Sequence, residues 1–148
     1  MISITKVEEL DLNVLQKLRA ESSREGFQFM ERLSDEWVSG ANRFDNPGEA
    51  LFLAVVDEEV VGVCGLNRDP YASAPNIGRV RRLYVLREHR RGGVGRALLN
   101  AVIAHARNHF KILRVRTDAA TEFYAANGFR PDASDAEATH VLDLTKIA

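Results

Sequence analysis

A basic, glycine-rich segment lies between a β-rich run and an amphipathic helical pattern. It reads Arg90-Arg91-Gly92-Gly93-Val94-Gly95, follows Leu83-Tyr84-Val85-Leu86 and continues into Arg96-Ala97-Leu98-Leu99. Glycines let a backbone approach a ligand closely, and the first amides of a helix have no acceptor within it. The helix dipole and the three arginines add positive charge. The segment therefore predicts a strand, a phosphate-binding loop and a helix, in that order.

Two other phosphate-binding loops are excluded. The dinucleotide fingerprint G-x-G-x-x-G fails because Leu98 stands in place of its third glycine. Val115 and Arg116 stand about 20 residues further on, where the fingerprint needs an acid for the ribose. The nucleoside-triphosphate loop is absent, since neither glycine run continues into Lys-Ser or Lys-Thr. What remains is Arg-x-x-Gly-x-Gly.

This motif, carried by Arg90, Gly93 and Gly95, is similar to the Gln/Arg-x-x-Gly-x-Gly/Ala loop of the GNAT superfamily of N-acetyltransferases. The family usually precedes its loop with a strand ending Leu-x-Val, which residues 83–85 match. A second family signature, Ala-x-x-x-Tyr-x-x-x-Gly-Phe, is matched by Ala120, Tyr124, Gly128 and Phe129. The resemblance covers most of residues 51–144 and implies an enzyme that uses acetyl-CoA as cosubstrate to acetylate an amine.

The hydrophobic patterns predict one domain over residues 1–148. Strand patterns cover residues 2–7, 51–56, 60–66, 77–86, 112–117 and 141–144, and helical patterns cover 10–24, 31–40, 94–107 and a short segment ending at 127–128. The resemblance implies an α/β fold of the α+β type, with a mixed, mostly antiparallel central sheet of about six to seven strands flanked by about four helices. In this family the strand before the loop is bulged and splays from the next strand to admit pantetheine.

Composition excludes several classes of protein. The 148 residues are 45% hydrophobic and 28% charged, with a net charge of -1, so no overall field favours nucleic acid or an anionic membrane. Because of the charged residues before position 12 we expect no signal peptide, and no later run reaches membrane-spanning length. We expect a cytoplasmic protein with neither nucleic acid nor membrane as partner. Cys64, the single cysteine, lies in an apolar run and is expected to be a buried packing residue without a disulfide.

The resemblance also assigns cofactor-binding residues. Amides of residues 91 and 93–96 would hold the pyrophosphate, and the main chain of Leu83 and Val85 would pair with the pantetheine arm. Thr117 stands where relatives often have an asparagine that contacts this arm, and its hydroxyl could take over part of that contact. The expected acetyl-CoA-binding residues are Leu83, Tyr84, Val85, Arg90, Arg91, Gly92, Gly93, Val94, Gly95, Arg96 and Thr117.

Tyr124 is the expected general acid. The reference pKa of tyrosine is about 10 and that of a thiol about 8.5, so a tyrosine that is protonated at neutral pH can donate its proton to the departing sulfur. A general base is harder to assign, because residues 78–85 contain no carboxylate where many family members have a glutamate. Glu31, Asp35, Glu36 and Asp69 remain as candidates that would act through water.

The acceptor is expected to be a small-molecule or peptide amine. Strand alternation places Arg79 and Arg81 on one face and Arg82 on the other, so one set could meet an anionic group of the acceptor. His105 and His109 lack the glutamate and third ligand of a zinc site, so no metal is expected. Two alternatives stay open, a noncatalytic acyl-CoA-binding sensor or regulatory module and an acyltransferase that uses a larger acyl-CoA. Edge strands in such folds often pair, so a homodimer is also open.

Overall fold

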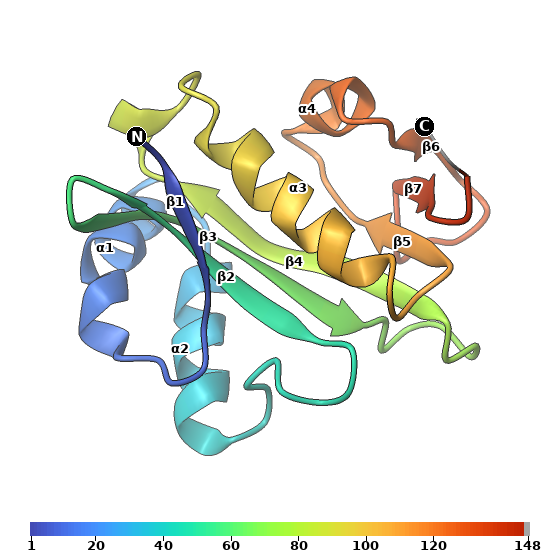
Figure 1. Ribbon diagram of the computed structural model, residues 1–148, viewed down its shortest axis with the longest axis horizontal. Coiled ribbons are helices and arrows are strands. Elements are labelled where there is room, and N and C mark those ends of the chain that lie inside the picture. The colour runs from blue at the N-terminus through green and yellow to red at the C-terminus, as the bar shows by residue number, and fades with distance from the viewer. Residues whose placement is uncertain (147–148) are drawn as a thin grey trace.

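A seven-stranded mixed sheet forms the centre of the computed structural model, which describes residues 1–146 (Figure 1). The strand order is β1-β2-β3-β4-β5-β7-β6. Only β4 and β5 pair in parallel. The strands are β1 (Ser3–Lys6), β2 (Ala50–Val56), β3 (Glu59–Arg68), β4 (Ile77–Val85), β5 (Ile112–Val115), β6 (Arg130–Pro131) and β7 (His140–Asp143).

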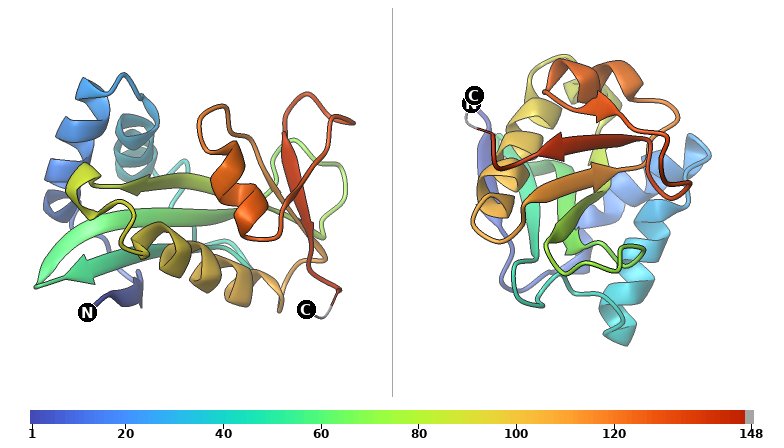
Figure 2. Two further views of the ribbon diagram at one scale, coloured as in Figure 1. Left: turned by 90° about the horizontal axis from the view of Figure 1, so that it is seen from above. Right: turned by 90° about the vertical axis from the view of Figure 1, so that its right-hand side faces the viewer.

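Helices cover both faces of this sheet. They are α1 (Gln16–Arg24), α2 (Phe29–Ser39), α3 (Val94–Ala106) and α4 (Thr121–Ala126), with short 3-10 turns η1 (Leu12–Leu15) and η2 (Arg87–His89). The pair α1 and α2 packs on one face, and α3 packs along β1 to β4 on the other (Figure 2). At Gly62 of β3 an added Cβ would lie 2.9 Å from Leu98 of α3. The first turns of α3 therefore pack closely on β3.

Local sequence explains where these elements begin and end. Asp57 and Glu58 join β2 to β3 as a two-residue turn with φ of 50° and 66°, the sign that matches the twist of a hairpin. Helix α2 ends at Gly40, whose φ of 82° stops the helix. The fully buried side chains are almost all aliphatic: Leu15, Leu18, Met30, Leu33, Leu51, Leu66, Leu98, Leu99, Leu113, Val61, Val63 and Val102. They form one core on both sides of the central strands.

The strand β4 is bulged in its middle. Gly65 of β3 pairs with Arg81, and Val63 pairs with Tyr84, so both Arg82 and Leu83 stand opposite Cys64. Arg82 has a φ of 60°. On its other side β4 pairs with β5 only over residues 77–79, so residues 80–85 have no partner strand there. The expected bulge and splay are both confirmed.

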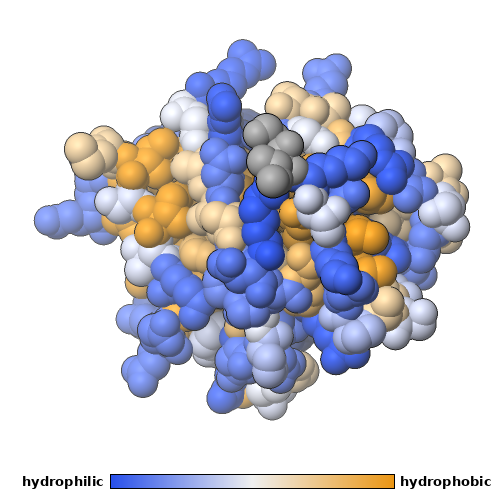
Figure 3. Space-filling model, turned by 45° about the vertical axis from the view of Figure 1, so that its right-hand side comes forward, coloured by the Kyte–Doolittle hydropathy of each residue, from blue (hydrophilic) through white to orange (hydrophobic). Residues whose placement is uncertain are grey.

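The predicted element order and sheet type are confirmed, with two differences. The short strand β6 carries only a two-residue ladder and has no periodicity that could reveal it. The prediction that Arg82 lies on the sheet face opposite Arg81 is wrong. The bulge interrupts the strand alternation between these two residues, and the Arg82 side chain contacts Glu36 on α2. No helix within residues 1–146 is long and apolar enough to cross a membrane. The face drawn in Figure 3 carries apolar patches separated by a band of hydrophilic side chains.

Candidate active site

The loop before α3 presents a row of free backbone amides. Gly93 is the N-cap of α3, with a φ of 88° that favours glycine, and the first bond of the helix runs from the Ala97 amide to the Gly93 carbonyl. The amides of residues 91–96 donate no hydrogen bond to any described residue. Because these amides open a helix of 13 residues, they form a site for a phosphate group.

The three arginines of the loop differ in their surroundings. Arg91 and Arg96 are exposed and form no ion pair within residues 1–146. The Arg90 guanidinium instead binds Glu25, the C-cap residue of α1, through two contacts of 2.7 and 3.2 Å. It also donates through Nε to the Val85 carbonyl at 2.9 Å. The Glu25 carboxylate thus offsets the charge of the Arg90 guanidinium, and the expected contribution of Arg90 to coenzyme binding stays a prediction.

The free side of β4 offers main-chain groups of alternate residues. The Leu86 amide donates to the Val61 carbonyl at 2.9 Å, so Leu86 and Tyr84 direct their peptide groups toward β3. Val85 directs its peptide group to the side without a partner strand. Since Leu83 stands at the bulge, it also escapes regular pairing with β3. Leu83 and Val85 can thus pair with an extended ligand. The peptide group of Tyr84 is used within the sheet, and the expected part of Tyr84 in binding acetyl-CoA stays a prediction.

The Tyr84 side chain belongs to a polar cluster between β4 and the carboxyl end of α1, formed with Glu21, Glu25, Arg87 and Arg90. Its hydroxyl lies 2.8 Å from Oε1 of Glu21 and 2.5 Å from Oε1 of Glu25. Hydrogen bonds from Arg90 and then from Tyr84 lower the pKa of Glu25 from 4.5 to about 2. Burial, followed by these two carboxylates, raises the pKa of Tyr84, which stays neutral. Because Glu21 also accepts from the Arg87 amide at 2.7 Å, the cluster fixes the end of β4 and the loop to α1.

Sequence reasoning did not assign Glu21 and Glu25 to the site. Their spacing of four residues does place them on one face of α1, but two acids on a helix are usually solvated. Only the packing of α1 against β4 brings them to Tyr84 and Arg90. The one local signal was Tyr84 itself, because it stands among the aliphatic residues Leu83, Val85 and Leu86 and a buried tyrosine hydroxyl usually has a polar partner.

Tyr124 lies at the centre of the short helix α4. It is 4% exposed, and its ring packs edge-on against Phe123 and Phe129, with centroid distances of 5.2 and 5.3 Å. Burial, and to a lesser extent the nearby Cys64, raises the pKa of its hydroxyl. No hydrogen bond joins this hydroxyl to another described residue. Tyr124 is therefore protonated at neutral pH and has no competing partner among residues 1–146. The raised pKa makes it a weaker acid than a free tyrosine, and its expected role as general acid stays a prediction.

Thr117 holds the turn that leads into α4. Its Oγ1 accepts a hydrogen bond from the Ala120 amide at 2.9 Å, and its own amide donates to Oγ1 of Thr139 at 3.0 Å. The N-cap residue of α4 is Ala120, which makes no side-chain capping hydrogen bond. The hydroxyl proton of Thr117 has no acceptor among residues 1–146, so its expected contact with a pantetheine arm stays a prediction.

Three of the four carboxylates considered as general base are engaged by arginines. Glu31 binds Arg19 through two contacts of 3.0 and 3.1 Å, which lower its pKa. Glu36 binds Arg82 at 2.9 Å. Asp69, with a fully buried side chain, lies 3.5 Å from Nη1 of Arg79 and 3.1 Å from Nε of Arg114. Each of these three carboxylates therefore already has an arginine partner that a substrate amine or a water molecule would have to displace.

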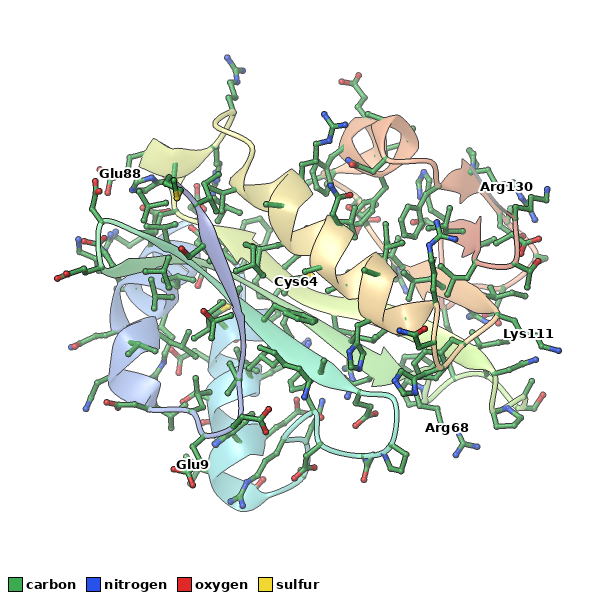
Figure 4. The ribbon with its side chains drawn as sticks, in the orientation of Figure 1. Glu9, Cys64, Arg68, Glu88, Lys111 and Arg130 are labelled. Atoms are coloured by element: carbon green, nitrogen blue, oxygen red, sulfur yellow. The ribbon has the colours of Figure 1, made fainter. Side chains whose placement is uncertain are left out.

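Two other sequence features are placed away from this chemistry. Cys64 is fully buried in the middle of β3, beneath α3, and burial raises the pKa of its thiol (Figure 4). The prediction of a buried packing cysteine is confirmed.

The rings of His105 and His109 lie 4.9 Å apart at the end of α3, and burial, followed by the charge of His109, lowers the pKa of His105. No cluster of three or more metal-ligating side chains occurs in the described part of the chain.

Known proteins share this arrangement. The family model of the acetyltransferase (GNAT) family matches residues 13–129. A crystal structure assigned as an acetyltransferase from Exiguobacterium sp. 255-15 is 31% identical, with a TM-score of 0.86, over 98% of this chain and 95% of that one. A GNAT-family acetyltransferase from Staphylococcus aureus Mu50 is 19% identical, with a TM-score of 0.77, over 97% and 99%.

The same fold also occurs within a larger enzyme. N-acetylglutamate synthase from Neisseria gonorrhoeae, solved in complex with coenzyme A and N-acetyl-glutamate, is 18% identical to this chain, with a TM-score of 0.66. The match covers 95% of this chain and 34% of that one. At this identity the likeness concerns the fold alone.

Proposed function

Because the chain belongs to the GNAT acetyltransferase family, we propose that it transfers the acetyl group of acetyl-CoA to a primary amine by direct attack in a ternary complex. One observation carries the proposal. The free amides of residues 91–96 open α3 directly after a strand whose outer side lacks a partner from residue 80 onward. This combination fits a ligand with a pyrophosphate at one end and a peptide-like arm at the other.

The residues fit acetyl-CoA part by part. The amides at the start of α3, with the exposed charges of Arg91 and Arg96, would bind the pyrophosphate. Leu83 and Val85 would exchange main-chain hydrogen bonds with the pantetheine amides, as an added strand does. The bulge at Arg82 and Leu83 leaves peptide groups unpaired where the thioester would lie. Acetyl-CoA supplies the activated acyl group when it is bound.

Tyr124 would complete the transfer. The amine nitrogen forms a bond to the acetyl carbon, the bond from this carbon to sulfur breaks, and Tyr124 gives its hydroxyl proton to the departing sulfur. The proton released by the nitrogen passes to water, since Glu31, Glu36 and Asp69 are held by arginines and Asp35, the fourth candidate, is exposed to solvent. An alkyl amine with a pKa of about 10.4 is mostly protonated at pH 7, so the acceptor reacts through its small free-amine fraction.

The paired state of these carboxylates favours a second candidate. A protein that binds acyl-CoA as a sensor or regulatory module needs the loop and the free side of β4 but no base. The enzyme is preferred because the buried Tyr124 side chain offers a neutral hydroxyl without a hydrogen-bond partner among residues 1–146. A sensor has no need for such a proton donor.

Thiol release from acetyl-CoA, measured against amino acids, polyamines, aminoglycosides and peptides, tests the proposal. We expect at least one class of amine to raise thiol release well above the rate of acetyl-CoA hydrolysis in water. Calorimetric titration with coenzyme A separates the two candidates. Binding of the coenzyme without release for any amine would support the sensor, and absence of binding would contradict both.

A further inference from the structure

Four guanidinium groups gather where β4 meets α2, the loop after β3 and the segment between β6 and β7. They are those of Arg79, Arg81, Arg82 and Arg114, and three carboxylates face them, those of Glu36, Asp69 and Asp135. Glu36 binds Arg82, Asp69 binds Arg79 and Arg114, and Asp135 binds Arg114 at 3.0 Å. The cluster therefore holds one positive charge more than it holds negative charges.

That excess charge lies on Arg81. Its guanidinium makes no hydrogen bond or ion pair with any described residue, although the side chain is half-buried. Burial, followed by the like charge of Arg82, lowers its pKa, and Glu36 and Tyr71 offset only part of this effect. Nε of Arg82 is also buried without a partner. Burying a charge without a counterion is costly, so this arrangement is suited to an anion that arrives from outside.

Arg81 lies close to the place where the proposed acetyl transfer would occur. Arg81 directly precedes the bulge, two residues before Leu83, where the thioester would lie. Two residues span at most about 7 Å when fully extended, and the bulge at Arg82 shortens this span. A small molecule can thus place its amine at the thioester and an anionic group at Arg81.

We propose that the acceptor is an amine that also carries a carboxylate and that Arg81 binds this carboxylate. This inference rests on the proposed function. A planar guanidinium matches a carboxylate with two parallel hydrogen bonds. A single excess positive charge suits a monoanion better than a phosphate dianion. Tyr71 lies beside these arginines and is half exposed. Its ring stacks on the Arg79 guanidinium, at 4.8 Å from the ring centroid.

Matched acceptors test the assignment. Each amino acid is compared with its carboxamide and with an aminoalkyl phosphate of similar length, by thiol release from acetyl-CoA at saturating coenzyme. We expect kcat/KM to be about 10- to 100-fold higher for the carboxylate than for the carboxamide. Arg81→Gln should remove this preference through KM of the acceptor, whereas KM for acetyl-CoA stays unchanged. Arg81→Lys should restore part of it, and Arg130→Gln, at the far edge of the sheet (Figure 4), should behave as wild type.

The outcomes separate the two proposals. If amines are acetylated but carboxylates have no advantage, or keep their advantage in Arg81→Gln, the role of Arg81 is refuted while the proposed function stands. A preference for the aminoalkyl phosphate would replace the carboxylate as ligand and refute the assignment. If no amine of any kind releases thiol, the proposed function fails and this inference fails with it. The unchanged KM for acetyl-CoA shows that the Arg81 variants are folded.

Discussion

Replacing Glu25 by glutamine removes one charge from the cluster that joins α1 to the loop. The side chain is 14% exposed, and it receives hydrogen bonds from Arg90 and Tyr84 and an ion pair from Arg87. Glutamine keeps the size and one acceptor oxygen of the side chain. The substitution therefore tests the charge of Glu25, with little change in packing.

The magnitude follows from the pKa of Glu25. A decrease from 4.5 to about 2 corresponds to about 3 kcal/mol as an upper limit. Arg87 and Arg90 are partly in water, where screening weakens such pairs, so we expect a loss of about 1 to 2 kcal/mol in the free energy of unfolding at pH 7. This loss corresponds to a decrease of about 2 to 6 °C in Tm.

The pH dependence isolates the effect. Because the pKa of Glu25 is lower in the folded state than in the unfolded state, its contribution is complete above about pH 5 and is lost as pH falls toward 2. Urea denaturation of wild type and Glu25→Gln should thus show a gap at pH 7 that shrinks by more than half at pH 3. Glu9→Gln, a variant at an exposed side chain labelled in Figure 4, is the matched control and should change stability little at either pH.

Two results would refute this reasoning. A gap of equal size at pH 7 and pH 3 would mean that the charge of Glu25 is not what stabilises the cluster. The absence of any gap at pH 7 would mean that solvent screens the contacts to Arg87 and Arg90 completely.

The remaining predictions concern the loop and the general acid. Tyr124→Phe should lower kcat by about 100-fold or more while the dissociation constant for acetyl-CoA changes less than about twofold, since only the proton donor is lost; an unchanged kcat in steady-state assays would exclude Tyr124 as the acid. Gly93→Ala should lower the free energy of unfolding by about 1 to 2 kcal/mol, because φ of 88° is strained for alanine although its Cβ would meet no atom within 4 Å. Gly92→Ala is its control, since that glycine does not have a positive φ and its nearest contact would be 3.6 Å from the His89 carbonyl oxygen; equal losses in urea denaturation of both variants would argue against a role for backbone strain.

Sequence reasoning succeeded where the physics is local. In the loop from Arg90 to Gly95, Gly93 supplies a positive φ and the amides that follow begin the helix, as the glycine pattern predicts. Arg91 also has a positive φ, of 67°, which the glycine pattern does not predict. The periodicity of residues 94–107 is likewise enough to place α3 on the sheet. The bulge at Arg82 was expected only through the resemblance, and simple alternation gave the wrong face for this residue, because a bulge has no period from which it can be read.

The state of each charged side chain could not be read from the order of residues. Arg90, Arg81 and Arg82 are equivalent in sequence as basic residues around one strand, yet Arg90 and Arg82 are paired with acids from α1 and α2 while Arg81 is not. These pairs join residues 46 and 65 positions apart, so only the packing of helices onto the sheet decides them.

The sequence by itself determined the glycine-rich loop, the strand and helix on either side of it and the position of Tyr124, because each depends on neighbours within a few residues. The tertiary structure alone decided which peptide groups of β4 are free, which carboxylates are held by arginines and which guanidinium is left without a partner. Those properties depend on contacts between segments far apart in the chain, and such contacts exist only after the core has formed.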